Sequence, residues 1–150
     1  MQLLPIQQTL EANPFFARHP DCQDSLYMTF EFYKKVGFQP PWISYYAEKD
    51  GQLVGACAFK GAPVNGRVEI AYGTFPSYQH GGVATEMCRM LVALSLETDP
   101  TVQITARTLP ENNFSTRVLK KNGFVFGGTV HNEEDGEVWE WVKHIEILNT

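Results

Sequence analysis

The sequence predicts a layered, mixed α/β protein that forms a single domain. Its 150 residues are close to the length of one domain, and 43% of them are apolar, which is enough to build a core. Apolar residues alternate in the middle of the chain and follow a helical period after residue 82. No internal repeat or Ser/Gly-rich linker divides the chain, so we expect one domain over residues 1–150.

The first third of the chain predicts helices. Asn13-Pro14 favours a helix start, and apolar residues recur at helical spacing over residues 24–36. Gly37 follows this stretch and is typical of a helix end.

The middle of the chain predicts strands. Asp50-Gly51 and Asn65-Gly66 are turn signals that separate runs rich in aromatic and aliphatic residues. We therefore expect an antiparallel meander of three strands, over residues 42–48, 53–59 and 67–75.

The last third alternates helices and strands. The apolar stripe over residues 82–96 has helical spacing, Gly123 is typical of a helix end, and Asp135-Gly136 is a turn signal. The elements expected after that first helix are a strand over residues 102–108, a helix over 110–122 and a hairpin of strands over 124–130 and 138–143.

Composition excludes several classes of partner. The chain has 12 basic and 17 acidic residues and a net charge of −5, which argues against nucleic acid and anionic membranes as partners. No apolar run approaches the ~20 residues of a membrane span. Cys22, Cys57 and Cys88 are widely spaced and form no CxxC pair or zinc-type array. Cys57 and Cys88 lie in apolar runs, which predicts reduced, buried thiols in a cytoplasmic protein. His19, His131 and His144 have no ligand spacing, so we expect no metal.

The sharpest local feature is a glycine turn between the third strand and the helix that follows it. Gly81, Gly82 and Ala84 are small enough for a ligand to approach the backbone closely. The free N–H groups of the first helical turn and the helix dipole favour an anion such as phosphate there. The alternatives are an ordinary tight turn and a nucleotide site, although the Gly-Lys-Ser/Thr of a P-loop is absent.

Two motifs extend this feature. Gln79-x-x-Gly82-x-Ala84 is similar to the pyrophosphate loop of the GNAT superfamily of N-acetyltransferases, and the stretch 112–124 resembles that superfamily's later helix. Residues 68–72, Val-Glu-Ile-Ala-Tyr, resemble the branch related to ribosomal-protein N-terminal acetyltransferases. The resemblance covers about residues 42–143. It implies a mixed, mostly antiparallel central sheet with helices on both faces and, before it, a weak first strand within residues 1–6.

The resemblance also implies acetyl-CoA as co-substrate and specific residues to bind it. Thr74 and Phe75 would lie along the pantetheine arm, and Asn112 and Ser115 would touch the arm and the thioester end from the later helix. The pyrophosphate would be held, mostly through backbone N–H groups, by Gln79, Gly81, Gly82, Val83, Ala84 and Thr85.

Direct attack of a primary amine on the thioester requires a base, because a free alkylammonium has a pKa near ~10. Glu69 is the candidate base: it alternates with Val68 and Ile70, so its side chain points to the opposite face of the strand. The alternative is a structural Glu, on a solvated face or ion-paired with an arginine. The family's usual proton-donating Tyr is replaced by Leu119, which leaves Ser115 or water as the donor.

These inferences predict an acetyl-CoA-dependent N-acetyltransferase acting on a small-molecule or peptide amine. Leu119 keeps open a second function, a non-catalytic acyl-CoA-binding or regulatory module. Trp139 and Trp141 lie on one face of the last strand, which predicts a homodimer; the alternative is that both pack on their own helices.

Overall fold

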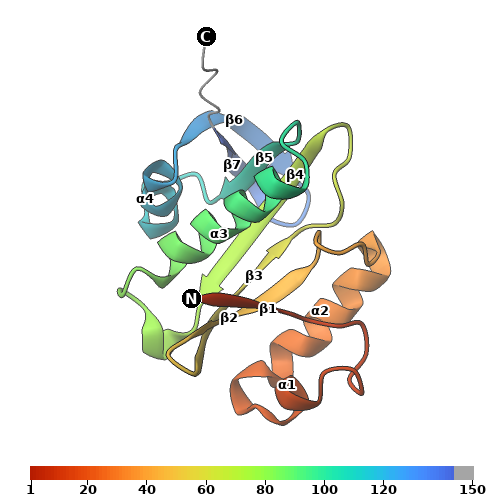
Figure 1. Cartoon of the computed structure of the whole chain (residues 1–150). Helices are drawn as coiled ribbons and strands as arrows, with labels where there is room; N and C mark the ends of the chain where they lie inside the picture. Colours follow the sequence, from red (N-terminus) through yellow and green to blue (C-terminus); the bar gives the residue numbers. More distant parts are fainter. Residues whose placement is uncertain (144–150) are drawn as a thin grey trace.

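A computed structural model of the chain describes residues 1–143. Its centre is a seven-stranded sheet with the strand order β1-β2-β3-β4-β5-β7-β6 (Figure 1). All neighbouring strands are antiparallel except the parallel pair β4 and β5. The strands are β1 Gln2–Pro5, β2 Ser44–Lys49, β3 Gln52–Phe59, β4 Arg67–Thr74, β5 Gln103–Thr108, β6 Phe124–Asn132 and β7 Gly136–Lys143.

Helices cover both faces of the sheet, and each face has its own apolar cluster. The first cluster joins α3 to the inward side chains of β3, β4 and β5, and Val118 and Leu119 of α4 also belong to it. The second cluster joins α1 and α2 to the opposite face of β2 and β3, around Tyr46. The helices are α1 Pro14–Arg18, α2 Gln23–Val36, α3 Val83–Thr98 and α4 Phe114–Lys121, with short 3-10 turns at Pro20–Cys22 and Pro76–Tyr78.

This arrangement confirms the predicted fold class of a mixed, mostly antiparallel sheet with helices on both faces. The weak first strand is present as β1, which pairs with β2. The helix expected over residues 110–122 begins only at Phe114, because Asn113 caps it: the Asn113 side chain accepts from the Thr116 N–H, and the Asn113 N–H donates to Thr116 Oγ1.

The cysteine prediction is confirmed as far as burial is concerned. All three cysteines are buried and unpaired, and burial raises the pKa of both Cys57 and Cys88 to about 12. Within residues 1–143, no helix is both long and apolar enough to cross a membrane.

The feature that positions the candidate site is a fork between β4 and β5. The two strands pair only from Arg67 to Ile70 on β4, while β4 continues to Thr74. The Glu69 carbonyl accepts from the Lys60 backbone N–H, and the Phe75 N–H donates to the Val54 carbonyl. The backbone groups of Glu69 and Phe75 therefore face β3. Since backbone groups alternate in direction along a strand, the N–H groups of Tyr72 and Thr74 point into the fork.

Candidate functional site

The turn from β4 into α3 has the geometry of an anion site. Gly82 is the residue before the helix and is left-handed, with φ of 80°, and no side chain caps the first turn of α3. The N–H groups of that turn therefore remain available to a ligand. His80 also has a positive φ, 70°, which costs about 1–2 kcal/mol for a non-glycine residue. Such backbone strain is concentrated at functional sites.

A cavity of about 260 Å³ connects this turn to the fork. It is lined by three elements and the turn between them: the end of β4, the start of α3 and the start of α4. Of the residues that the sequence singled out, it brings together Thr74, Gln79, Ala84 and Ser115. Its remaining lining residues are Tyr72, Gly73, His80 and Phe114.

The other predicted loop residues, Gly81, Gly82, Val83 and Thr85, do not line this cavity. Gly81 and Gly82 are exposed, whereas Val83 is buried in the first cluster. The Thr85 carbonyl accepts from Asn122 Nδ2 at 3.2 Å, which ties the C-terminal end of α4 to the first turn of α3. This hydrogen bond therefore holds the first turn of α3 against the C-terminal end of α4.

Phe75 and Asn112, the residues predicted to contact the pantetheine arm and the thioester, also lie outside this cavity. The ring centroid of Phe75 lies 6.3 Å from that of Tyr46, in the second cluster. The Phe75 N–H donates to the Val54 carbonyl at 2.9 Å. Asn112 is exposed and lines a different hollow, beside Trp141. Their predicted contacts with the pantetheine arm and the thioester stay predictions.

Tyr72 contributes a hydroxyl that the sequence did not single out as a proton donor. It lies at the fork end of the cavity, where its hydroxyl donates to the Ser115 carbonyl at 3.3 Å. Burial raises the pKa of this hydroxyl, so it keeps its proton. Leu119, one turn after Ser115 on α4, is fully buried. The period-two alternation with Val68 and Ile70 was the signal that Tyr72 faces α3 and α4.

Glu69 points to the other face of the sheet, as its alternation predicts, and lies in a cluster of ions. Its carboxylate is 2.8 Å from Lys60 Nζ and 3.5 Å from Arg107 Nε. Glu140 on β7 pairs with Arg67 at 2.7 Å and with Arg107 at 3.6 Å. The Glu69 side chain is only 20% exposed, so these cations hold its position.

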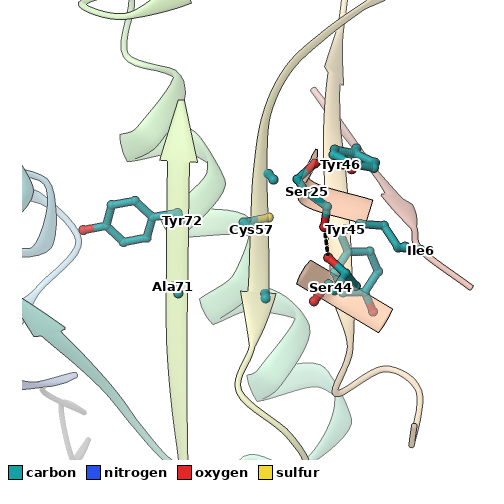
Figure 2. Close-up of a pocket in the computed structure, with 11 residues that line it drawn as sticks. Ile6, Ser25, Ser44, Tyr45, Tyr46, Cys57, Ala71 and Tyr72 are labelled. Carbon is teal, nitrogen blue, oxygen red and sulfur yellow. Dashed lines mark hydrogen bonds between the residues drawn. The ribbon is translucent and has the colours of Figure 1, made fainter. Parts of the chain in front are cut away.

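A trough on this same face runs between α2 and the strands β3 and β4. It consists of two adjoining hollows of about 320 and 210 Å³, which share Ser25, Thr29, Ser44, Ala58 and Ala71. Lys60 lines its end and links it to the Glu69 cluster. Figure 2 shows the inner hollow, with Tyr72 directed away from Ser25 and Ser44. We call the two hollows together the α2 trough.

The comparisons with known proteins agree with this architecture. Residues 6–125 match the family model described as an acetyltransferase (GNAT) domain. The chain therefore belongs to the GNAT acetyltransferase family. It is also 31% identical over 103 residues to the uncharacterized N-acetyltransferase YjdG of Bacillus subtilis (strain 168), a match covering 67% of this chain and 57% of that relative.

Solved structures of the family share the fold. The chain matches the aminoglycoside acetyltransferase AAC(6')-Ib in complex with coenzyme A, with a TM-score of 0.58, 26% identity, and coverage of 67% of this chain and 64% of that one. A spermidine N-acetyltransferase SpeG chimera from Vibrio cholerae and hSSAT gives a TM-score of 0.68 at 16% identity, and the match covers 95% of this chain and 94% of that one. The ribosomal L7/L12 alpha-N-protein acetyltransferase RimL gives a TM-score of 0.66 at 13% identity, and the match covers 96% of this chain and 94% of that one. At these two lower identities the match shows the fold alone.

Proposed function

We propose that this protein is an acetyl-CoA-dependent N-acetyltransferase that transfers an acetyl group to a primary amine. The observation that carries the proposal is the cavity that joins the uncapped N-terminus of α3 to the unpaired edge of β4. A phosphate group suits the first, and an extended chain with amide groups suits the second. The complex of AAC(6')-Ib with coenzyme A, in the same family, supports this cofactor.

Acetyl-CoA fits the residues present in the following way. The backbone N–H groups over residues 79–85 would hold the pyrophosphate, and the side chains of Gln79 and Thr85 lie at the two ends of that loop. The free backbone groups of Tyr72 and Thr74 would bond the pantetheine arm. The thioester would then lie at the fork, where a β4 N–H is available to the negative charge that develops on its oxygen.

The chemistry needs one group to take a proton and one to give a proton. The amine nitrogen forms a bond to the carbonyl carbon as the carbon–sulfur bond breaks. Glu69 receives the amine proton, directly or through water, and the hydroxyl of Ser115 or Tyr72 donates to the departing sulfur. Both hydroxyl-bearing residues line the cavity, whereas Glu69 approaches from the other face of the sheet.

A non-catalytic acyl-CoA-binding module is the second candidate. Two observations favour it: Leu119 is buried where the family's usual Tyr would stand, and Glu69 is engaged by two cations. It would have the same cavity and the same affinity for acetyl-CoA, without turnover.

One experiment separates these candidates. Acetyl-CoA should raise the melting temperature well above the effect of ATP or NAD, and release of free coenzyme A should depend on an added amine. Equal stabilisation by all three nucleotides would contradict the cofactor. Stabilisation by acetyl-CoA without amine-dependent release would favour the non-catalytic module.

We also propose a cytoplasmic location, a small-molecule or peptide amine as acceptor, and a homodimer formed through the last strands. For the homodimer, Trp141 packs inward on its own subunit, since its indole N–H donates to Thr108 Oγ1 at 3.0 Å and it lies beneath Lys120. Phe126 on the edge strand β6 is 53% exposed and stacks edge-on with Trp139. These two rings offer apolar surface to a second copy.

A further inference from the structure

We infer that the acceptor is a primary amine with a single positive charge and an apolar substituent, and that the substituent occupies the α2 trough. This inference rests on the proposed acetyl transfer and narrows its substrate class. It excludes polycations, which are the substrates named for two of the structural neighbours, an aminoglycoside acetyltransferase and a spermidine acetyltransferase.

The approach to the thioester comes from the face of the sheet that carries the trough. On the opposite face, the glycine turn and the start of α4 already border the cavity proposed for acetyl-CoA. Ala71 belongs to β4 at the point where β5 diverges, and its side chain lines the trough. Glu69 lies two residues earlier on the same face of the strand. An amine that lies over Ala71 is therefore next to both the fork and the proposed base.

The lining of the trough suits an apolar group. Its floor carries the methyl groups of Ala58 and Ala71, and its α2 wall carries Met28 and Phe32 (Figure 2 shows the inner end). The wall hydroxyls of Ser25 and Thr29 donate within α2 and its preceding turn, to the carbonyls of Cys22 and of Ser25 itself. These hydroxyls are therefore already satisfied and do not require a polar ligand.

The charges around the trough disfavour a polycation. Among the described residues that line it, none carries a carboxylate, and its charged member is Lys60. The ion cluster to which Lys60 belongs contains three cations, Lys60, Arg67 and Arg107, and two carboxylates. Arg107 is shared between the carboxylates of Glu69 and Glu140. One positive charge of the acceptor can be discharged by the base, whereas a second or third would lie against this excess of cations without a partner.

The acidic residues at the turn between β6 and β7 do not compensate for this. Residues 133–135 and Glu137 are at the far edge of the sheet, and β5 and β7 separate β6 from the strands that floor the trough. All four of these acidic residues are exposed.

The test compares three amines in a coenzyme A release assay: 2-phenylethylamine, spermidine and kanamycin. We expect kcat/KM to be at least about tenfold higher for 2-phenylethylamine. Met28 is 72% exposed at the trough, so Met28→Asp adds a carboxylate there without disturbing the core. It should lower kcat/KM for 2-phenylethylamine and raise it for spermidine. Tyr27→Asp is the matched control, since Tyr27 is 61% exposed on the same helix but outside the trough, and it should leave the ratio unchanged.

The outcomes are distinguishable from failure of the proposed function. A preference of the wild-type protein for spermidine or kanamycin overturns the inference and leaves acetyl transfer intact. An equal change of the ratio in Met28→Asp and Tyr27→Asp overturns it as well. Binding of acetyl-CoA without turnover of any of the three amines overturns the proposed activity, and this inference with it.

Discussion

Replacing Gly82 by valine tests the proposed pyrophosphate site directly. Gly82 has a φ of 80°, and a Cβ built on it meets no atom within 4 Å. The new side chain would therefore project into the open space where the anion is expected to meet the N–H groups of α3. Gly66 is the matched control, because it has a φ of 74° and equally open surroundings in the turn before β4.

The magnitudes follow from the backbone and from ligand linkage. A left-handed conformation costs an L-residue about 1–2 kcal/mol, so both variants should lose about 2–8 °C of melting temperature at about 2–4 °C per kcal/mol. Acetyl-CoA at about 100 times its Kd should add about 2.7 kcal/mol to the wild-type protein, a rise of about 5–11 °C. Gly66→Val should keep this rise and Gly82→Val should lose it.

The assay is thermal unfolding with and without acetyl-CoA for the three proteins. The difference between ligand-free and ligand-bound melting temperatures removes the common cost of the strained backbone. A full rise in Gly82→Val would refute the assignment of the pyrophosphate to this turn. Loss of the rise in Gly66→Val as well would show that the effect comes from destabilisation alone.

Three further predictions concern the reaction and the core. Glu69→Gln should lower kcat/KM by about 10²–10⁴-fold with little change in acetyl-CoA affinity. Glu140→Gln, in the same ion cluster, is the control and should keep kcat/KM within about threefold of wild type, roughly the precision of such a comparison. Equal losses in the two variants would make Glu69 structural. Tyr72→Phe should lower kcat by about tenfold or more while KM for acetyl-CoA is unchanged, and a change in KM alone would assign the hydroxyl to binding. Burial raises the pKa of Cys57 to about 12, so its thiol stays protonated in the folded chain after the unfolded thiol ionises near pH 9. The free energy of unfolding should therefore fall as pH rises from 9 towards 12. Urea titrations should show a smaller fall in Cys57→Ala.

Local signals in the sequence determined the elements and the turns between them. Asp50-Gly51 and Asn65-Gly66 were predicted as turns because asparagine, aspartate and glycine tolerate a positive φ, and all four residues have one. The glycine turn before α3 could be predicted from the sequence because its geometry depends on residues that are neighbours in the chain. Gly82 has the left-handed backbone that the motif suggested. The alternation that places Glu69 opposite Val68 and Ile70 is also a local property of a strand.

Only the tertiary structure decided which of these residues meet. The fork depends on where the pairing of β4 and β5 ends, and the Tyr72 hydroxyl reaches a carbonyl 43 residues away. The ion partners of Glu69 come from Lys60, just after β3, and from Arg107 on β5, and the α2 trough exists because Ala58 and Ala71 leave space beneath a helix from the first third of the chain. Such contacts depend on the order and spacing of strands in the sheet, which are set by packing across the whole core. A period of two or of 3.6 residues determines which way a side chain faces, but the neighbour it meets there is determined by the chain's long-range packing.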